Sequence, residues 1–250
     1  MGLSGQQAKA YGTQGFISGV RVVDNAQAEC YREQFDALES REGREKSQIG
    51  LQNRHFDQRF IWDLATHTGI LDCIEALIGP DVMILSTHVF CKYGAGEKFV
   101  AWHQDVTYWG LEPPEATTAW YAIDESDTEN GCMRVIPGSQ RDGIRQHGKS
   151  DSTENLLSIN QEAYVSAEEE SSAVDLVLKA GEMSLHNGSL IHSSLPNRSV
   201  RRRSGLTIRY MPPYVKQTER NSTGGTWQPI LVRGEDLFGH FRQIERPFPE

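Results

Sequence analysis

Apolar residues recur at helical spacing in two stretches of the first 80 residues. In the segment THTGILDCIEALIGP (66–80), the apolar stripe follows an i, i+1, i+4, i+7, i+8 pattern and consists of Ile70, Leu71, Ile74, Leu77 and Ile78. Gly79 followed by Pro80 is a common helix C-terminus. Asp24 with Gln27 resembles a capping box, and the run from there to about Ser40 favours a helix because it contains neither Gly nor Pro. We therefore predict two helices in this part of the chain.

After residue 80 the pattern changes to short runs rich in β-branched and aromatic residues. These runs, separated by Gly, Pro and Asn, are VMILSTHVF (82–90), TTAWYAI (117–123), CMRVIPG (132–138), VDLVLKAG (174–181), MSLH (183–186) and LTIRYMP (206–212). Many short strands at this spacing predict an antiparallel sandwich or barrel instead of alternating strands and helices. The polar segment 41–54 is expected to be a surface loop. The longer polar segment from about 140 to 172 is expected to be a lid or binding loop.

The composition excludes several classes of protein. The chain has 250 residues, a length that one all-β domain can reach, and 38% hydrophobic residues, which is enough to build a core. With 25 Lys+Arg against 34 Asp+Glu the formal net charge is −9, which argues against a broad nucleic-acid-binding face. No run approaches the roughly 18–20 apolar residues of a membrane span. Four widely spaced cysteines without a CxxC motif predict reduced thiols, and the first 16 residues lack the apolar core of a secretory signal, so we expect a cytoplasmic protein.

A His-x-Asp motif is the first candidate for chemistry. His103 and Asp105 stand two residues apart in VAWHQDVTYW, and on a strand such positions point to the same face, where both could bind one metal ion. His192, in SLIHSSLPN, is a candidate third ligand from a neighbouring strand, and His186, in LHNG, competes for this role. Two histidines and one carboxylate leave three open positions, which is typical of non-haem Fe(II) oxygenases, whereas catalytic zinc more often has three histidines or two with a glutamate. A His–Asp hydrogen bond on a surface strand is the alternative explanation of the motif.

An arginine cluster follows the third candidate ligand. Arg203 comes eleven residues after His192 and directly before the strand-like run SGLTIRY. A guanidinium group can bind the distal carboxylate of a dicarboxylate co-substrate through two parallel hydrogen bonds. The alternative is a solvated basic turn, and we expect at least one of Arg201, Arg202 and Arg203 to be only that.

Five segments in a fixed order resemble a known family. They are WHQD (102–105), TAW (118–120), NGCMRVIPGS (130–139), GEMSLHNGSLIHSSLPNRS (181–199) and RRSGLTIRY (202–210). This order is similar to that of the phytanoyl-CoA dioxygenase-type Fe(II)/2-oxoglutarate-dependent oxygenases, a superfamily that includes ectoine hydroxylases and natural-product hydroxylases. The resemblance covers residues 80–215 well and the N-terminal helices more loosely. It implies a mainly β fold in a single domain (1–250): a helical N-terminal part (1–80) flanks a double-stranded β-helix, a distorted cupin-like jelly roll, at 81–235.

The resemblance also implies the cofactors and the residues that bind them. His103, Asp105 and His192 would bind Fe(II), and O2 and 2-oxoglutarate would be co-substrates. The residues implied for 2-oxoglutarate are Arg203 for its 5-carboxylate, Trp120 in the wall of that pocket, Ser194 as a nearby hydrogen-bonding group and His88 at the border of the site.

The chain departs from the family pattern at two positions. Gln140 replaces the histidine of the commoner PGSH turn, and Ser193 replaces the glycine of the commoner HGS motif. In halogenating relatives the carboxylate position is Ala or Gly. Because Asp105 is present here, the resemblance favours hydroxylation or another C–H oxidation over halogenation.

Four further residues are candidates for contact with the substrate: Tyr108, Arg134, His147 and Arg209. Arg209 lies six residues after Arg203, so both can share one strand face. A second cation there would suit an anionic or polyhydroxylated substrate, and a structural salt bridge is the alternative. We expect the substrate to be a small polar metabolite or natural-product intermediate, with no nucleic-acid or membrane partner. No pattern in the sequence indicates an oligomeric state.

The leading hypothesis is an Fe(II)/2-oxoglutarate-dependent hydroxylase or related oxidase that releases succinate and CO2. A cupin-like metal enzyme without 2-oxoglutarate is the second hypothesis, and it would not need Arg203. A non-catalytic jelly-roll binding module with a vestigial His-x-Asp motif is the third.

Overall fold

The helices of the computed structural model lie mainly in the first third of the chain. The structure describes residues 2–157 and 159–248. The α-helices are α1 (Gly5–Gln14), α2 (Asn25–Glu42), α3 (Arg44–Ile49), α4 (Arg59–Ala65), α5 (Thr68–Ile78) and α6 (Ala167–Ser171), and the 3-10 helices are η1 (Arg54–Phe56), η2 (Asp105–Tyr108) and η3 (Ser139–Asp142). In the part of the chain that is described, no helix is both long and apolar enough to cross a membrane.

Antiparallel strands make up most of the remaining regular structure. They are β1 (Phe16–Arg21), β2 (Val82–Lys92), β3 (Val100–His103), β4 (Leu111–Glu112), β5 (Thr117–Ala122), β6 (Met133–Val135), β7 (His147–Lys149), β8 (Gln161–Ala163), β9 (Val174–Leu176), β10 (Glu182–Asn187), β11 (His192–Ser194), β12 (Arg203–Met211), β13 (Lys216–Gln217) and β14 (Ile230–Arg233). A six-stranded sheet has the order β1-β10-β5-β12-β2-β14 and a four-stranded sheet the order β3-β11-β6-β9. The pairs β13–β4 and β7–β8 are separate. The prediction of a mainly β, antiparallel protein is confirmed.

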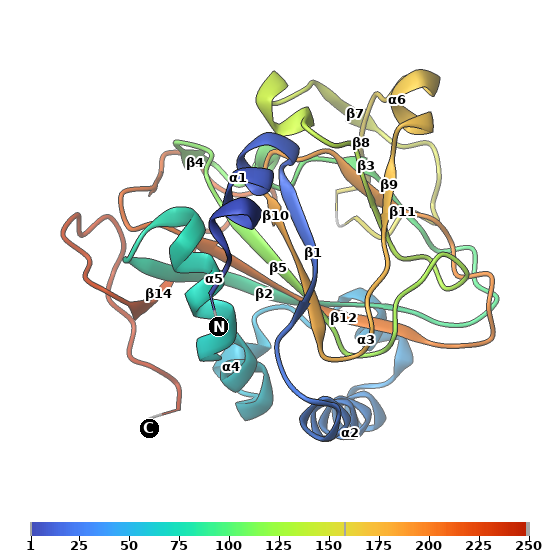
Figure 1. The fold of residues 1–250 in the computed structure, drawn as a ribbon, viewed down its shortest axis with the longest axis horizontal. Coiled ribbons are helices and arrows are strands. Elements are labelled where there is room, and N and C mark those ends of the chain that lie inside the picture. The colour runs from blue at the N-terminus through green and yellow to red at the C-terminus, as the bar shows by residue number, and fades with distance from the viewer. Residues whose placement is uncertain (1, 158, 249–250) are drawn as a thin grey trace.

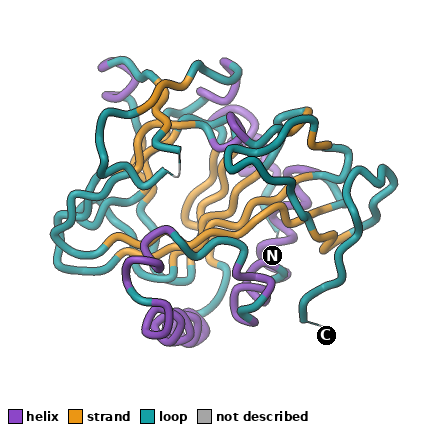
Figure 2. Tube along the Cα trace, turned by 180° about the vertical axis from the view of Figure 1, so that it is seen from behind, coloured by secondary structure: helices purple, strands orange, loops and turns teal. Residues whose placement is uncertain are grey.

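The N-terminal helices cover one face of the six-stranded sheet. Figures 1 and 2 show α2 and α4 along the lower side of the strands. The largest hydrophobic core lies between these two layers, because Phe35 of α2, Leu64 of α4 and Ile74 of α5 belong to the same buried cluster as Tyr121 and Ile208 of the sheet. The opposite face of the sheet, where Trp120 and Ala122 pack with residues of β6, is left for the site.

Strand β12 illustrates how the sequence divides the two faces. Leu206, Ile208 and Tyr210 alternate with polar or small residues and belong to the helix-facing core. Because side chains alternate along a strand, Arg203 and Arg209 therefore point to the other face. The expectation that these two arginines share one face agrees with this alternation.

The predicted helices are confirmed, but the segments around them are more regular than expected. Helix α2 starts after Asp24, whose side chain accepts a hydrogen bond from the backbone N–H of Gln27, and α5 ends at Gly79 with a φ of 95°. The segment 41–54 was expected to be a loop, and this prediction was wrong: α3 lies within it, held by ion pairs of Glu42 with Lys46 and Arg54. The N-terminal part also contains β1, which pairs with β10.

The polar segment 140–172 contains short elements. It includes the β7–β8 hairpin and α6, while Ser158 lies outside the described residues. We refer to residues 143–157 and 159–171 as the lid segment. Figure 1 shows its elements grouped at one end of the molecule, on the opposite side from α2.

Candidate metal centre

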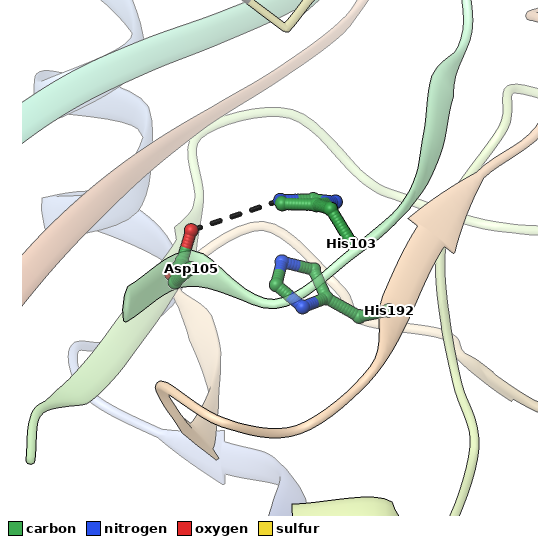
Figure 3. Close-up of side chains that lie close together, drawn as sticks. All are labelled: His103, Asp105 and His192. Carbon is green, nitrogen blue, oxygen red and sulfur yellow. Dashed lines mark ion pairs between the residues drawn. The ribbon is translucent and has the colours of Figure 1, made fainter. Parts of the chain in front are cut away.

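The three predicted ligands come together from two neighbouring strands. His103 is the last residue of β3, and His192 is the first residue of β11, which pairs with β3 so that the two histidines are opposite each other. The imidazole centroids are 4.1 Å apart. Asp105 does not continue the strand, as the motif had predicted, but starts the 3-10 helix η2. The turn nevertheless brings Asp105 Oδ1 to 3.7 Å from His103 Nε2 (Figure 3).

The geometry of the set fits a metal ion. One ligand atom from each of His103, Asp105 and His192 lies within 4.8 Å of the other two. Nδ1 of His103 is 2.9 Å from the carbonyl oxygen of Ala101, and Nδ1 of His192 is 3.0 Å from that of Leu190. Because a carbonyl only accepts, both Nδ1 atoms carry the proton and both Nε2 atoms present a lone pair. This arrangement is usual for histidines that bind metals.

The protonation states also suit a cation. Burial holds the pKa of His192 well below its ordinary value, so that the imidazole is neutral. Burial opposes the ionisation of Asp105, but the pKa of this carboxyl lies well below its usual range, and the Arg209 guanidinium is the largest cause that lowers it. Two imidazoles and one carboxylate are the donor set that the sequence predicted for Fe(II).

A row of residues across the six-stranded sheet supports Asp105 from behind. His186 of β10 pairs with Thr118 of β5, and Thr118 pairs with Arg209 of β12. Thr118 Oγ1 donates to Asp105 Oδ2 at 3.0 Å, His186 Nε2 is 3.5 Å from the same oxygen, and Arg209 Nη2 is 3.5 Å from Oδ1. His186, the competing ligand, thus lies against Asp105, and it is not part of the cluster that could hold a metal. No pattern in the sequence indicated that Thr118 contacts the site.

The cavity beside the three ligands also contains the residues expected to hold 2-oxoglutarate. Arg203, Trp120 and Ser194 line it together with His103, Asp105 and His192. The Arg203 guanidinium lies over the Trp120 ring, 5.2 Å from its centroid, and Nε donates to the carbonyl oxygen of Gly131 at 3.0 Å.

Lys92 is a residue of this cavity that the sequence analysis missed. It is the last residue of β2, pairs directly with Arg203, and donates from Nζ to Ser194 Oγ at 2.6 Å. Its amine also donates to the carbonyl oxygens of Gly131 and Leu195. The only signal in the sequence was a lysine two residues after the strand-like run 82–90.

Lys92 and Arg203 make the cavity suitable for an anion. Both side chains are buried, and burial lowers the pKa of both, that of Arg203 to about 10. Their hydrogen bonds go to carbonyl and hydroxyl oxygens, and within the described part of the chain neither forms an ion pair with a carboxylate. Two buried cations without an acidic partner are costly unless an anion joins them. The cavity therefore fits a carboxylate near Arg203 and a metal at the three ligands.

A larger cavity of about 290 Å³ adjoins the first at His103 and Asp105. Tyr108 and Arg209 line it, as expected for residues that face a substrate. His88 also lines it, and not the cavity of Arg203, so the expectation that His88 borders the co-substrate does not match its position. Burial lowers the pKa of His88 to about 3, which leaves it neutral. The segment 221–228 supplies another wall, which no sequence pattern had indicated.

Two predicted substrate residues line neither cavity. Arg134 forms an ion pair with Asp175 at 3.0 Å and lies over the Trp102 ring, which makes it a structural residue of β6. His147 accepts a hydrogen bond at Nε2 from the backbone N–H of Gln104 and contacts the ring of Tyr108. Their assignment as substrate residues stays a prediction, and the structure shows both side chains bonded to neighbouring residues outside the two cavities.

The fold and the site define an antiparallel β protein with a buried two-histidine, one-carboxylate site of the type used by non-haem iron oxygenases. The model of the phytanoyl-CoA dioxygenase (PhyH) family matches residues 11–205, and the chain belongs to this family.

Relatives and solved structures agree with this assignment. The chain is 31% identical to phytanoyl-CoA dioxygenase 1 of Oryza sativa subsp. japonica over 50% of its own length and 43% of that protein, and 26% identical to a probable alpha-ketoglutarate-dependent hypophosphite dioxygenase of Stutzerimonas stutzeri over 79% and 68%. The matches to the phytanoyl-CoA dioxygenases of rice and Arabidopsis thaliana thus span less than half of those proteins. The non-heme monooxygenase ThoJ has a similar structure, with a TM-score of 0.79 and 29% identity over 96% of this chain and 88% of ThoJ. CytC3 with Fe(II) and alpha-ketoglutarate, at 22% identity and a TM-score of 0.71 over 97% and 93%, shares the fold.

Proposed function

We propose that this chain is a non-haem Fe(II)- and 2-oxoglutarate-dependent oxygenase. It would hydroxylate, or otherwise oxidise, a C–H bond of a small polar metabolite or natural-product intermediate and release succinate and CO2. The observation that carries the proposal is one cavity lined by both a two-histidine, one-carboxylate set and two buried cations that lack an acidic partner. A metal enzyme without 2-oxoglutarate would have no use for Arg203 and Lys92.

The residues of the chain would divide the work as follows. His103, Asp105 and His192 would bind Fe(II), and Arg203 would receive the 5-carboxylate of 2-oxoglutarate, with Lys92 beside it. Ser194 would hold the Lys92 amine, and Trp120 would keep the guanidinium in place by stacking. The iron, O2 and 2-oxoglutarate would supply the oxidising chemistry, while the protein binds, orients and excludes water.

The expected fold and domain organisation belong to the same proposal. We assign residues 1–250 to one oxygenase domain with a jelly-roll core at 81–235. The six-stranded and four-stranded antiparallel sheets support this assignment, since Trp120 of one packs with Met133 and Leu176 of the other.

The larger cavity is the proposed substrate site. Asp105 and Arg209 are the charged residues in its wall apart from the histidines, and Arg209 contacts Asp105 and lies over the Trp109 ring. Tyr108 and Trp109 offer aromatic surface, and the rest of the wall is rich in Asn, Gln, Ser and Thr. Such a wall suits a polar substrate with few charges. An intact Asp105 carboxylate favours hydroxylation or a related C–H oxidation over halogenation.

An anaerobic titration tests the proposal. Fe(II) followed by 2-oxoglutarate should produce a weak visible charge-transfer band in the wild type, and Arg203→Ala should lose this band at the same 2-oxoglutarate concentration. Arg201→Ala is the matched control, because Arg201 pairs with Asp127 and Glu129 at the surface, and it should keep the band. Metal uptake without a band would point to a cupin-like enzyme, and no metal uptake would point to a binding module. A screen for succinate release against pools of metabolites would then identify the substrate.

A further inference from the structure

Gln104, the residue between the two ligands of the His-x-Asp motif, is fully buried and uses its whole side-chain amide. Nε2 donates to the carbonyl oxygens of Gly143 at 2.9 Å and Ser189 at 2.7 Å, and Oε1 accepts from the backbone N–H of Arg145 at 2.8 Å. Its own backbone N–H donates to His147 Nε2 at 3.1 Å. Four hydrogen bonds therefore connect this one residue to two distant segments of the chain.

These bonds end at two functionally important places. Ser189 lies in the turn between β10 and β11, three residues before the ligand His192. The other bonds end at the start of the lid segment, at Gly143, Arg145 and His147. His147 is the first residue of β7. Gln104 thus connects the His-x-Asp motif to the turn that precedes His192 and to the first residues of the lid segment.

Arg145 extends the connection to the far end of the lid segment. Its Nη1 donates to the carbonyl oxygen of Tyr164 at 3.2 Å, and its Nη2 pairs with Glu169 of α6 at 2.5 Å. The lid segment also contributes Leu156 to the cavity of Arg203 and Leu157 to the larger cavity. The order of this segment therefore bears directly on both cavities.

The chemistry of the site explains why a glutamine stands here. The position needs two N–H donors for two carbonyl oxygens and one acceptor for an amide N–H, and among side chains of this length only a carboxamide offers that combination. Glutamate would place a carboxylate against two carbonyls, and methionine would remove the partner of all three backbone groups.

We propose that Gln104 is a positioning residue that couples the order of the lid segment to metal occupancy. This inference rests on the proposed metal site at His103, Asp105 and His192. A metal ion that fixes these ligands also fixes the backbone on both sides of Gln104, and the hydrogen bonds of Gln104 transmit that restraint to residues 143–147. Because such coupling is reciprocal, an unrestrained lid segment weakens metal binding.

Hydrogen exchange measured by mass spectrometry tests the coupling, with Ni(II) alone as a redox-inert probe. In the wild type, saturation with Ni(II) should slow amide exchange of lid peptides by about tenfold. In Gln104→Met at saturating Ni(II) this protection should be lost, while exchange in α5 stays unchanged and reports an intact fold. Gln146→Met is the matched control, because Gln146 is an exposed residue of the same segment, and it should behave like the wild type.

A second variant keeps the inference testable if Gln104→Met folds poorly. Arg145→Ala leaves the backbone N–H bonded to Gln104 and removes the side-chain bonds to Tyr164 and Glu169. Metal-dependent protection should then persist at residues 143–149 and disappear at 164–171.

The possible outcomes separate the two proposals. Nickel bound to the wild type without protection of the lid segment, or full protection in Gln104→Met, would overturn the inference and leave the metal site standing. Loss of protection at 143–149 in Arg145→Ala would also overturn it. A wild type that binds no nickel would refute the proposed function and, with it, this inference.

Discussion

Replacing Thr118 by valine should weaken metal binding although Thr118 touches no metal. The Thr118 hydroxyl donates to Oδ2 of Asp105, and valine keeps the shape of the side chain but cannot donate. Asp105 is buried, so water has little access to replace the missing donor. The carboxylate would lose both part of its charge stabilisation and one restraint on its orientation toward His103.

The size of the effect follows from the kind of bond that is lost. A hydrogen bond to a charged group contributes about 1.5–3 kcal/mol. Since every 1.4 kcal/mol corresponds to about tenfold in an equilibrium constant, the metal affinity should fall by about 10–100-fold. This range agrees with the effect of about 10–100-fold that is usual for groups that orient metal ligands.

The measurement is an anaerobic titration of metal-free protein with Co(II), followed through the visible ligand-field bands. Thr117→Val, on the same strand but bonded to Tyr11 on the other face of the sheet, is the matched control. Its free energy of unfolding should fall by about 1 kcal/mol because the Tyr11 hydroxyl loses its hydrogen bond with Thr117, while its Co(II) affinity should not change. Equal Co(II) affinities of Thr118→Val and the wild type would refute the idea that the sheet positions Asp105.

Three further changes have distinct expected outcomes. Lys92→Met should weaken binding of 2-oxoglutarate by about tenfold or more and leave Fe(II) binding intact. The charge-transfer titration measures both. A weaker Fe(II) affinity with normal 2-oxoglutarate binding would contradict the assignment. Gly205→Ala should lower the free energy of unfolding by about 1–3 kcal/mol or more in urea and also weaken 2-oxoglutarate binding, because a Cβ at this position of β12 would overlap the Trp120 ring. Burial lowers the pKa of His55 to about 4, so the unfolded chain, with a histidine pKa near 6.5, binds the proton more tightly between these values. The free energy of unfolding should therefore be highest above pH 6.5 and fall by about 3 kcal/mol toward pH 4. Urea unfolding of His55→Gln should show a pH dependence smaller by up to one proton. An unchanged pH dependence would show that His55 is not the group concerned.

The sequence predicted the parts of the fold and site that depend on short-range patterns. The apolar stripe before Gly79 identified α5, and the residue pair Asp24 and Gln27 identified the start of α2. The spacing of His103 and Asp105 indicated a metal site even though the strand stops between them. A turn and a strand can both bring residues i and i+2 close together. The two ligands are therefore close to each other, although Asp105 starts a 3-10 helix where a strand was predicted.

The sequence could not predict contacts that depend on strand register. Thr118, His186 and Arg209 meet at Asp105 because β10, β5 and β12 pair so that these residues form one row. A shift of one residue in either pairing would turn one of them to the opposite face, and no local pattern encodes the choice. The same reasoning explains Arg134 and His147, whose side chains were expected in the substrate site but are satisfied by Asp175 and Gln104.

Lys92 is a residue of the candidate site whose place there depends on strand pairing. Its buried amine stands opposite Arg203, and both cations donate to the carbonyl oxygen of Gly131, a residue with a φ of 78° that favours glycine. A side chain at this turn would collide with the backbone at Leu195, so the turn can offer its carbonyl to both cations only with glycine in place. A carbonyl oxygen neutralises neither charge. The pairing of β2 with β12 thus places two basic side chains at one end of the cavity without an acidic partner among the described residues, and this arrangement fits a carboxylate group of a ligand.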